Sequence, residues 1–402
     1  MRLRYTSNGT EKGTGMKLDS FLHGILPAML LSMAVGQIYA FTNFASEISA
    51  TIGYSLAQVQ FAFSLGIFFL GMGAAFFGKF VEKNVKGATV FGSVLFLAGL
   101  LLTQAAVLRR SLWLLYAGYG VLLGLGTGII YISPVKTMMM WFPQRKAVAS
   151  SIPIIFFGLG STLSTFLLPL FMRQGIERVF LCYAVFYLLM MGVGALLLAK
   201  PDCFSREVAK GSADFSYAKL LKNRFFIQSW IFMLLNISAG LCLIPLSKQM
   251  MNSELIGYGK GVIMIIVALS GVFNGCGRFV FAYFSDGLKQ RTNIVFFILG
   301  ISAASMLATS VWPPAIGVVL LLINSCYGAG FSVMPGILSD RFGMSDISKI
   351  HGAVLSAWGV AGLVGNNLAM MVGGRHGYHA VLWMICGLYL VNIINWLSLK
   401  KH

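Results

Sequence analysis

Long apolar stretches separated by short polar loops run along almost the whole of this 402-residue chain. Each stretch contains roughly eighteen residues or more, enough for an α-helix to cross the ~30 Å core of a bilayer. Because lipid offers no hydrogen-bond partners, a spanning segment must satisfy its own backbone polar groups, as a helix does. The pattern therefore predicts an all-α membrane protein. Twelve spans are expected, at residues 25–47, 56–78, 88–108, 112–139, 147–172, 179–199, 225–249, 260–285, 292–311, 314–337, 350–373 and 378–398.

The composition agrees with this class. Hydrophobic residues make up 57% of the chain and charged residues 10%, and the mean hydropathy is +0.81. A soluble globular protein carries roughly 25% charged residues. The chain is therefore expected to have the lipid bilayer as its solvent.

The distribution of positive charge predicts the orientation. If both termini are cytoplasmic, the cytoplasmic segments hold 21 of the 30 lysines and arginines and the opposite loops hold 7. Lys136 and Arg278 lie within spans. This is the positive-inside bias of inserted proteins, and it explains the net charge of +18 without a nucleic-acid partner. We expect a multi-pass protein of the cytoplasmic membrane, with both termini and the linker at residues 200–224 in the cytoplasm.

Several classes of chemistry find no support. The six cysteines lie mostly inside spans and include no CxxC pair, so neither a disulfide framework nor a metal site is indicated. There is no HExxH, G-x-S-x-G or Walker-type phosphate loop. We therefore expect a protein that is not an enzyme, binds no cofactor or metal, and is not driven by ATP.

The longest polar interruption, residues 200–224, divides the spans six and six. It predicts a tail at 1–24, a six-helix half at 25–199, a linker at 200–224, a second half at 225–398 and a tail at 399–402.

Weak echoes link the two halves. The loop after the second span reads "GKFVEKNVKG" and the loop after the eighth reads "YFSDGLKQR", with an acid, Glu82 or Asp286, ahead of basic residues in each. The fourth and tenth spans carry "GTGIIYISP" and "YGAGFSVMP", and the fifth and eleventh carry "GLGS" and "GLVG". These glycine patches are expected to serve close helix packing. The echoes suggest a parallel duplication, the arrangement of the major facilitator fold, with substrate bound at the midplane between halves.

More specific segments resemble the oxalate/formate antiporter family of that superfamily and, more distantly, the proton-linked monocarboxylate transporters. The resemblance covers essentially the whole chain. The segments that carry it are "GLGTGIIYISPVKTMMMWFPQRKAVASSIPIIFFGLGS" (124–161), "GQIYAFTNF" (36–44), "CYGAGFSVMPGILSDRFG" (326–343), "GAVLSAWGVAGLVGN" (352–366) and the stretch around Arg278.

Arg278 is the principal candidate for substrate binding. An arginine at the centre of a span costs ~2.5–3.5 kcal/mol on insertion scales, and such residues usually face a cavity. Its planar fork matches a carboxylate with two parallel hydrogen bonds. The resemblance implies the same role, because both families hold the substrate carboxylate with an arginine of this helix. The alternative is an ion pair that locks helices together, but Glu47, Glu82 and Asp286 all lie at span ends.

Other residues are weaker candidates. Tyr131, Tyr327 and Trp358 are expected either to surround a small anion or to pack as ordinary aromatic residues. Gln37 and Asn274 are buried polar groups that need a partner or water. Asn274 lies one helical turn from Arg278 and shares its face. Lys136 lies near the cytoplasmic boundary, where a structural contact or snorkelling is favoured over substrate binding.

Two departures from the relatives bear on the substrate. Trp358 stands where the oxalate exchanger has a lysine, so a dianion would keep an uncompensated charge. Asn274 stands where the proton-linked carriers have an aspartate, so that pair cannot carry the proton.

We therefore expect a monomeric secondary transporter for a monocarboxylate such as formate, lactate or pyruvate, working by alternating access as an antiporter or a proton-linked symporter. Oxalate exchange, a carrier for another organic anion, and a transporter-like sensor remain as alternatives.

Overall fold

A computed structural model describes residues 18–201, 216–252 and 257–399. These residues form helices joined by short loops, and none of them lies in a strand. The helices are η1 Phe21–Ile25, α2 Leu26–Val35, η2 Gly36–Asn43, α3 Ala45–Ile52, α4 Leu56–Lys83, α5 Val85–Leu108, α6 Leu112–Leu115, η3 Tyr116–Leu123, α7 Gly124–Trp141, α8 Lys146–Met172, α9 Ile176–Leu197, α11 Tyr217–Leu221, α12 Arg224–Asn252, α13 Lys260–Gly287, α14 Asn293–Val311, η5 Pro313–Ala315, α15 Ile316–Phe342 and α16 Ile347–Leu397.

The prediction of an all-α protein with twelve spans is confirmed. Among the described residues, twelve helical segments are long and apolar enough to cross a membrane. The first runs over Leu18–Asn43 rather than 25–47, because α3 forms a separate short helix after it. The last two spans are joined within α16, where Gly377 has a φ of 78° and turns the chain between them.

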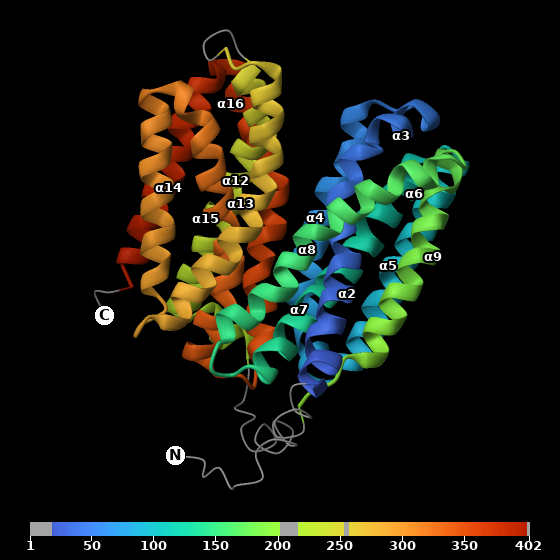
Figure 1. Cartoon of the computed structure of the whole chain (residues 1–402), viewed down its shortest axis with the longest axis horizontal. Helices are drawn as coiled ribbons and strands as arrows, with labels where there is room; N and C mark the ends of the chain where they lie inside the picture. Colours follow the sequence, from blue (N-terminus) through green and yellow to red (C-terminus); the bar gives the residue numbers. More distant parts are fainter. Residues whose placement is uncertain (1–17, 202–215, 253–256, 400–402) are drawn as a thin grey trace, which may run out of the picture.

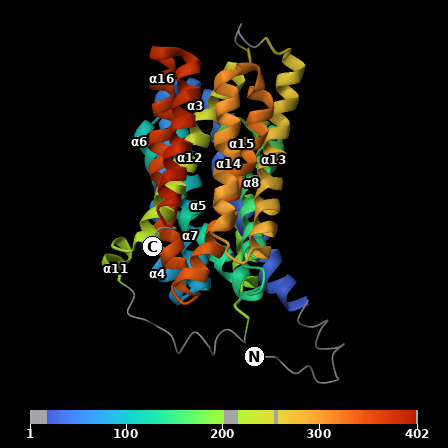
Figure 2. The same cartoon turned by 90° about the vertical axis from the view of Figure 1, so that its left-hand side faces the viewer.

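The spans form two bundles, α2–α9 and α12–α16, as Figure 1 shows in blue to green and in yellow to red. The bundles meet at the end of the molecule where α9 ends and α12 begins, on either side of the linker, and they diverge toward the opposite end. The view in Figure 2, turned by 90°, shows α11 at this same end. We call these ends the linker side and the far side.

Glycines bring the two bundles into backbone contact. A Cβ atom added at Gly352 of α16 would lie 2.0 Å from the carbonyl oxygen of Ala74 on α4, and one at Gly359 would lie 2.7 Å from that of Phe68. Small residues of this kind let membrane helices approach closely. The packing role predicted for the echoed glycine patches is seen at Gly128, where an added Cβ would lie 2.0 Å from the carbonyl oxygen of Leu70, and at Gly328, where it would lie 2.6 Å from that of Asn274.

The two echoed acids make equivalent contacts between the halves. Glu82, at the end of α4, accepts a hydrogen bond of 2.9 Å from the backbone N–H of Ser348 at the start of α16. Asp286, near the end of α13, accepts hydrogen bonds of 3.1 and 2.9 Å from the N–H groups of Ala147 and Val148 at the start of α8. Each carboxylate thus satisfies a helix N-terminus of the opposite half, where negative charge is favoured.

The linker was expected as a loop over residues 200–224. Residues 202–215 lie outside the described part, but Tyr217–Leu221 forms the short helix α11. The Tyr217 hydroxyl donates a hydrogen bond of 3.2 Å to the carbonyl oxygen of Ala75 on α4. The end of the linker is therefore attached to the first half as well as to α12.

Candidate substrate-binding site

Arg278 lies within α13 and is 5% exposed. The glycines around it explain how a long side chain fits between packed helices. A Cβ atom added at Gly277 would lie 2.4 Å from the carbonyl oxygen of Ser325 on α15. One added at Gly328 would lie 2.6 Å from the carbonyl oxygen of Asn274 and 2.9 Å from the arginine's Cγ. Helices α13 and α15 are thus in contact at this point, which restricts the position of the guanidinium.

Neutral groups hold the guanidinium in place. Its Nε donates a hydrogen bond of 2.9 Å to Oδ1 of Asn274, and Nη1 donates to the backbone carbonyl oxygen of Ile154 on α8, in the other half. Its Cζ lies 5.9 Å from the centroid of the Phe331 ring. Among the described residues, none of the carboxylates in ion pairs is paired with Arg278. Since the guanidinium carries five N–H donors, some of these donors remain available to a ligand.

Beside the arginine lies an aromatic cluster of Tyr39, Tyr131, Phe157, Phe331 and Trp358. The Trp358 ring is central, with centroid distances of 4.6 Å to Phe331, 5.5 Å to Tyr131 and 5.8 Å to Phe157. Tyr39 lies 5.5 Å from Phe157 and 6.4 Å from Trp358. The first half supplies three of these rings and the second half two, so the cluster lies where the halves meet.

Two hydrogen-bond donors in this cluster have no partner among the described residues. Both the Tyr131 hydroxyl and the Trp358 Nε1 are buried without an acceptor. An unsatisfied buried donor costs ~1–3 kcal/mol, so such groups call for a ligand or water. Tyr131 is also within electrostatic range of Arg278. One guanidinium and two unpaired hydrogen-bond donors could together bind a small anion whose oxygen atoms accept hydrogen bonds.

Tyr327 lies at the edge of this arrangement. It is 5% exposed, its ring centroid lies 5.4 Å from that of Phe331, and it is within electrostatic range of Arg278 and Tyr39. The structure therefore brings together five of the six residues singled out from the sequence: Arg278, Asn274, Tyr131, Trp358 and Tyr327.

Gln37 lies elsewhere. It is fully buried in η2 beside Tyr119, whose ring packs 4.4 Å from Phe41 inside the first half. Neither atom of its amide group has a hydrogen-bond partner in the described residues. No described contact joins Gln37 to the aromatic cluster, because the side chain points toward its own bundle.

Lys136 makes a structural contact, the interpretation that the sequence favoured. It is 2% exposed and forms an ion pair with Glu82. Since the same carboxylate accepts from Ser348, the lysine belongs to the contact between the halves on the linker side. Its charge is therefore already compensated.

The sequence reasoning missed Tyr39, Phe157, Phe331 and His351. His351 is 2% exposed, its Nε2 has no partner, and its ring centroid lies 6.4 Å from that of Tyr131. Helical spacing could have indicated two of these residues, since Phe331 lies four residues after Tyr327 and His351 lies two turns before Trp358. Among the described residues, no group of His, Cys, Asp and Glu could hold a metal ion.

Comparisons with known proteins agree with this architecture. The family model for the Major Facilitator Superfamily matches residues 25–365. The MFS-type transporter YhjX of Escherichia coli K12 is 26% identical, with 84% of this chain and 85% of YhjX aligned. The oxalate:formate antiporter of Oxalobacter formigenes is 25% identical, over 92% of this chain and 89% of the antiporter. Human monocarboxylate transporter 10 is 23% identical, over 72% of this chain and 60% of its own length.

Solved structures share the fold at low identity. A bacterial homologue of the iron transporter ferroportin, in its outward-facing state, superposes with a TM-score of 0.73 at 14% identity, over 96% of this chain and 100% of its own. The fucose:proton symporter FucP in its outward conformation gives 0.65 at 14% identity, over 92% of this chain and 98% of its own. The family match over most of the spans and the two six-helix bundles lead to one conclusion: the chain belongs to the Major Facilitator Superfamily of membrane transporters.

Proposed function

We propose that this transporter carries a small monocarboxylate, such as formate, lactate or pyruvate, by alternating access between its two halves. The observation that carries the proposal is Arg278, buried at the junction of the halves without a carboxylate partner among the described residues. Two unpaired donors, on Tyr131 and Trp358, lie beside it. The names of two relatives, an oxalate:formate antiporter and a monocarboxylate transporter, support a carboxylate substrate.

A single negative charge is favoured over two. Arg278 is the cation at the cluster, and Trp358 occupies the position where the oxalate exchanger has a lysine. Lys136, a second basic residue within a span, is paired with Glu82. A dianion would therefore retain one uncompensated charge away from water, which is costly.

The arrangement of the halves supports entry from the far side. Contacts between the halves reach from Arg278 and Ile154 to the acid-capped helix ends on the linker side. If the linker side is cytoplasmic, as the positive charges predict, this arrangement faces outward. Transport then requires these contacts to break and the far side to close.

The function is tested by reconstituting the purified protein in proteoliposomes. Uptake of labelled formate, lactate and pyruvate is measured with and without an unlabelled internal anion, and oxalate is added as a competitor. We expect uptake of at least one monocarboxylate and at least tenfold weaker competition by oxalate. Equal or tighter oxalate competition would contradict the charge selectivity. Substrate binding without any uptake or exchange would favour a sensor.

One observation favours proton-linked symport as the mode of coupling. His351 is a buried titratable group with an unpaired Nε2 next to Tyr131. Two charged groups of helices packed against α16, Lys136 of α7 and Glu82 of α4, are paired with each other, and Lys349 of α16 itself is paired with Asp346.

Replacing His351 by Gln removes the proton site and keeps a polar side chain. For a symporter, we expect His351→Gln to lose accumulation driven by a pH gradient while anion exchange continues. Unchanged gradient-driven uptake would rule out His351 as the coupling group.

A further inference from the structure

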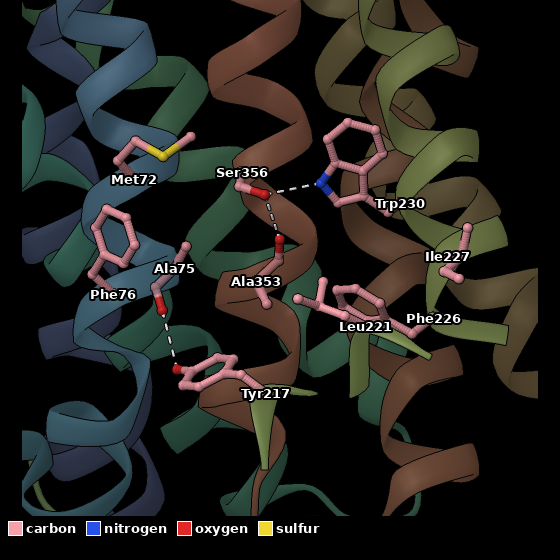
Figure 3. Close-up of a pocket in the computed structure, with 10 residues that line it drawn as sticks. All are labelled: Met72, Ala75, Phe76, Tyr217, Leu221, Phe226, Ile227, Trp230, Ala353 and Ser356. Carbon is pink, nitrogen blue, oxygen red and sulfur yellow. Dashed lines mark hydrogen bonds between the residues drawn. The ribbon is translucent and has the colours of Figure 1, made fainter. Parts of the chain in front are cut away.

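A groove of about 610 Å³ opens on the side of the bundle, away from Arg278. It lies between α4 of the first half and α12 and α16 of the second half, and α11 closes it on the linker side (Figure 3). Its size falls within the ~300–1,000 Å³ of ligand sites. The residues that line it are Met72, Ala75, Phe76, Tyr217, Leu221, Phe226, Ile227, Trp230, Ala353 and Ser356.

The lining presents hydrocarbon to an occupant. Its polar groups bond to each other: the Trp230 Nε1 donates to Oγ of Ser356 at 2.9 Å, and that hydroxyl donates to the carbonyl oxygen of Ala353 at 2.7 Å (Figure 3). The Tyr217 hydroxyl donates a hydrogen bond to the carbonyl oxygen of Ala75. Phe76 is 73% exposed and lies in a membrane span, so the groove opens toward the bilayer. An apolar groove in that position fits an acyl chain.

Lysines border the groove at its linker end. Lys79 and Lys83 follow Phe76 by three and seven residues on α4, so they share its face, and both are exposed. Lys222 directly follows Leu221 and is also exposed. Within residues 72–83 and 216–230 the single acid is Glu82, which is paired with Lys136. The mouth of the groove is therefore positively charged.

We propose that this groove binds an anionic phospholipid, with one acyl chain between α4 and α12 and the headgroup on Lys79 and Lys222. The chain spans the membrane, so lipid is the solvent against which the groove opens. Clusters of basic residues beside a span attract anionic lipids by about 1 kcal/mol for each residue. The apolar groove and its basic mouth together match the two parts of such a lipid.

The site connects lipid binding to the conformation of the transporter. Its walls come from both halves, and α11 is attached to α4 through Tyr217. Because α4 and α16 both line the groove, a separation of these helices on the linker side would change its shape. A lipid that binds this form and not the other stabilises it. We therefore expect anionic lipid to favour the observed arrangement, whatever the substrate is.

The test is native mass spectrometry of the purified full-length protein in a neutral detergent. The protein is titrated with phosphatidylglycerol and, separately, with phosphatidylcholine of the same acyl chains. We expect one phosphatidylglycerol to be retained more tightly than phosphatidylcholine. Ala75→Trp fills the groove and should abolish this retention, and Ile227→Trp fills it from the opposite wall if the first variant folds poorly.

A second groove supplies the matched control. It has a volume of about 300 Å³, lies between α14 and α16 within the second half, and is lined by Ala304, Leu307 and Trp383 among others. Ala304→Trp adds the same bulk there and should leave the retained lipid in place. In thermal unfolding, phosphatidylglycerol should raise the midpoint of the wild type and of Ala304→Trp but not that of Ala75→Trp.

The headgroup contact is tested by Lys79→Gln and Lys222→Gln. Each should weaken phosphatidylglycerol binding about fivefold and leave phosphatidylcholine unchanged. Lys289→Gln, at an exposed loop lysine on the same side, is the control and should change neither lipid. Equal retention of both lipids by the wild type, or retention that neither Ala75→Trp nor Ile227→Trp reduces, overturns the proposal. Neither readout uses transport, so a wrong substrate leaves this test intact.

Discussion

Arg278 is stable in the membrane because it is neither exposed to lipid nor isolated. Asn274 and the backbone carbonyl of Ile154 accept hydrogen bonds from two of its N–H groups, and the guanidinium carbon lies over the Phe331 ring. These acceptors are neutral, so the positive charge itself is not cancelled. A structural arginine would be expected to have a carboxylate partner. The arrangement orients the guanidinium and leaves its charge uncompensated among the described residues, as the proposed carboxylate site requires.

Arg278→Lys should abolish or severely impair transport while the protein stays inserted and folded. Lysine retains the charge but loses the two-pronged geometry, and the loss of a charge-assisted hydrogen bond weakens binding by ~1.5–3 kcal/mol, roughly tenfold to more than a hundredfold. Uptake and thermal unfolding are measured together. Arg173→Lys, in a loop on the far side, is the control. Normal uptake by well-folded Arg278→Lys would refute the role, and early unfolding would point to a helix clamp.

Tyr131→Phe separates a ligand donor from a packing ring. The hydroxyl has no partner within the part of the chain that the structure describes, so its removal should leave stability unchanged or slightly higher. Substrate affinity should fall by about tenfold, because a hydrogen bond to a charged acceptor contributes ~1.5–3 kcal/mol. Tyr187→Phe, in the core of the first half, should leave affinity unchanged. Binding is measured by isothermal titration. Unchanged affinity in Tyr131→Phe would assign Tyr131 to packing.

At the scale of elements, the contact of α4 with α16 depends on the absence of side chains. The Cβ atoms of Gly352 and Gly359 would overlap with backbone atoms of α4, which cannot rotate away. Glu82 and Asp286 then join helix ends across the halves. The echo of these acids in the two loops, seen in the sequence, corresponds to equivalent contacts in the fold.

Gly352→Ala should push α4 and α16 apart and disfavour the observed arrangement, because the new Cβ would lie 2.0 Å from the Ala74 carbonyl oxygen. A cysteine placed at the buried Ser150, which donates to the Ser332 carbonyl oxygen of the other half, reports the opening. We expect its labelling by a small maleimide to rise severalfold. Gly374→Ala, where a Cβ meets nothing within 4 Å, is the control. Equal labelling in both variants would show that the contact does not close the linker side.

For the whole molecule, the positive charges predict that both termini and the linker are cytoplasmic. A single cysteine introduced at Lys222, with the exposed Cys276 replaced by Ser, should react with an impermeant maleimide only after the cells are opened. Labelling in intact cells would reverse the orientation and with it the direction in which the observed arrangement faces.

The twelve spans, the division into halves and the presence of an arginine within a span could be predicted because each depends on local sequence. A membrane helix satisfies its own backbone, so length and hydropathy are enough to place it. A fixed charge in such a segment is costly wherever the segment packs, and Arg278 could therefore be recognised without its neighbours.

Only the tertiary structure decided which side chains meet. The rings of Phe157 and Phe331 join Trp358 from different spans, Lys136 is paired with Glu82 from another helix, and Gln37 faces Tyr119 instead of Arg278. These outcomes depend on how each helix is rotated about its axis and on which residues far along the chain pack against it. Hydropathy determines that a helix spans the membrane. The helices of this chain are apolar on every face, so hydropathy does not determine which face of a helix points toward the protein interior.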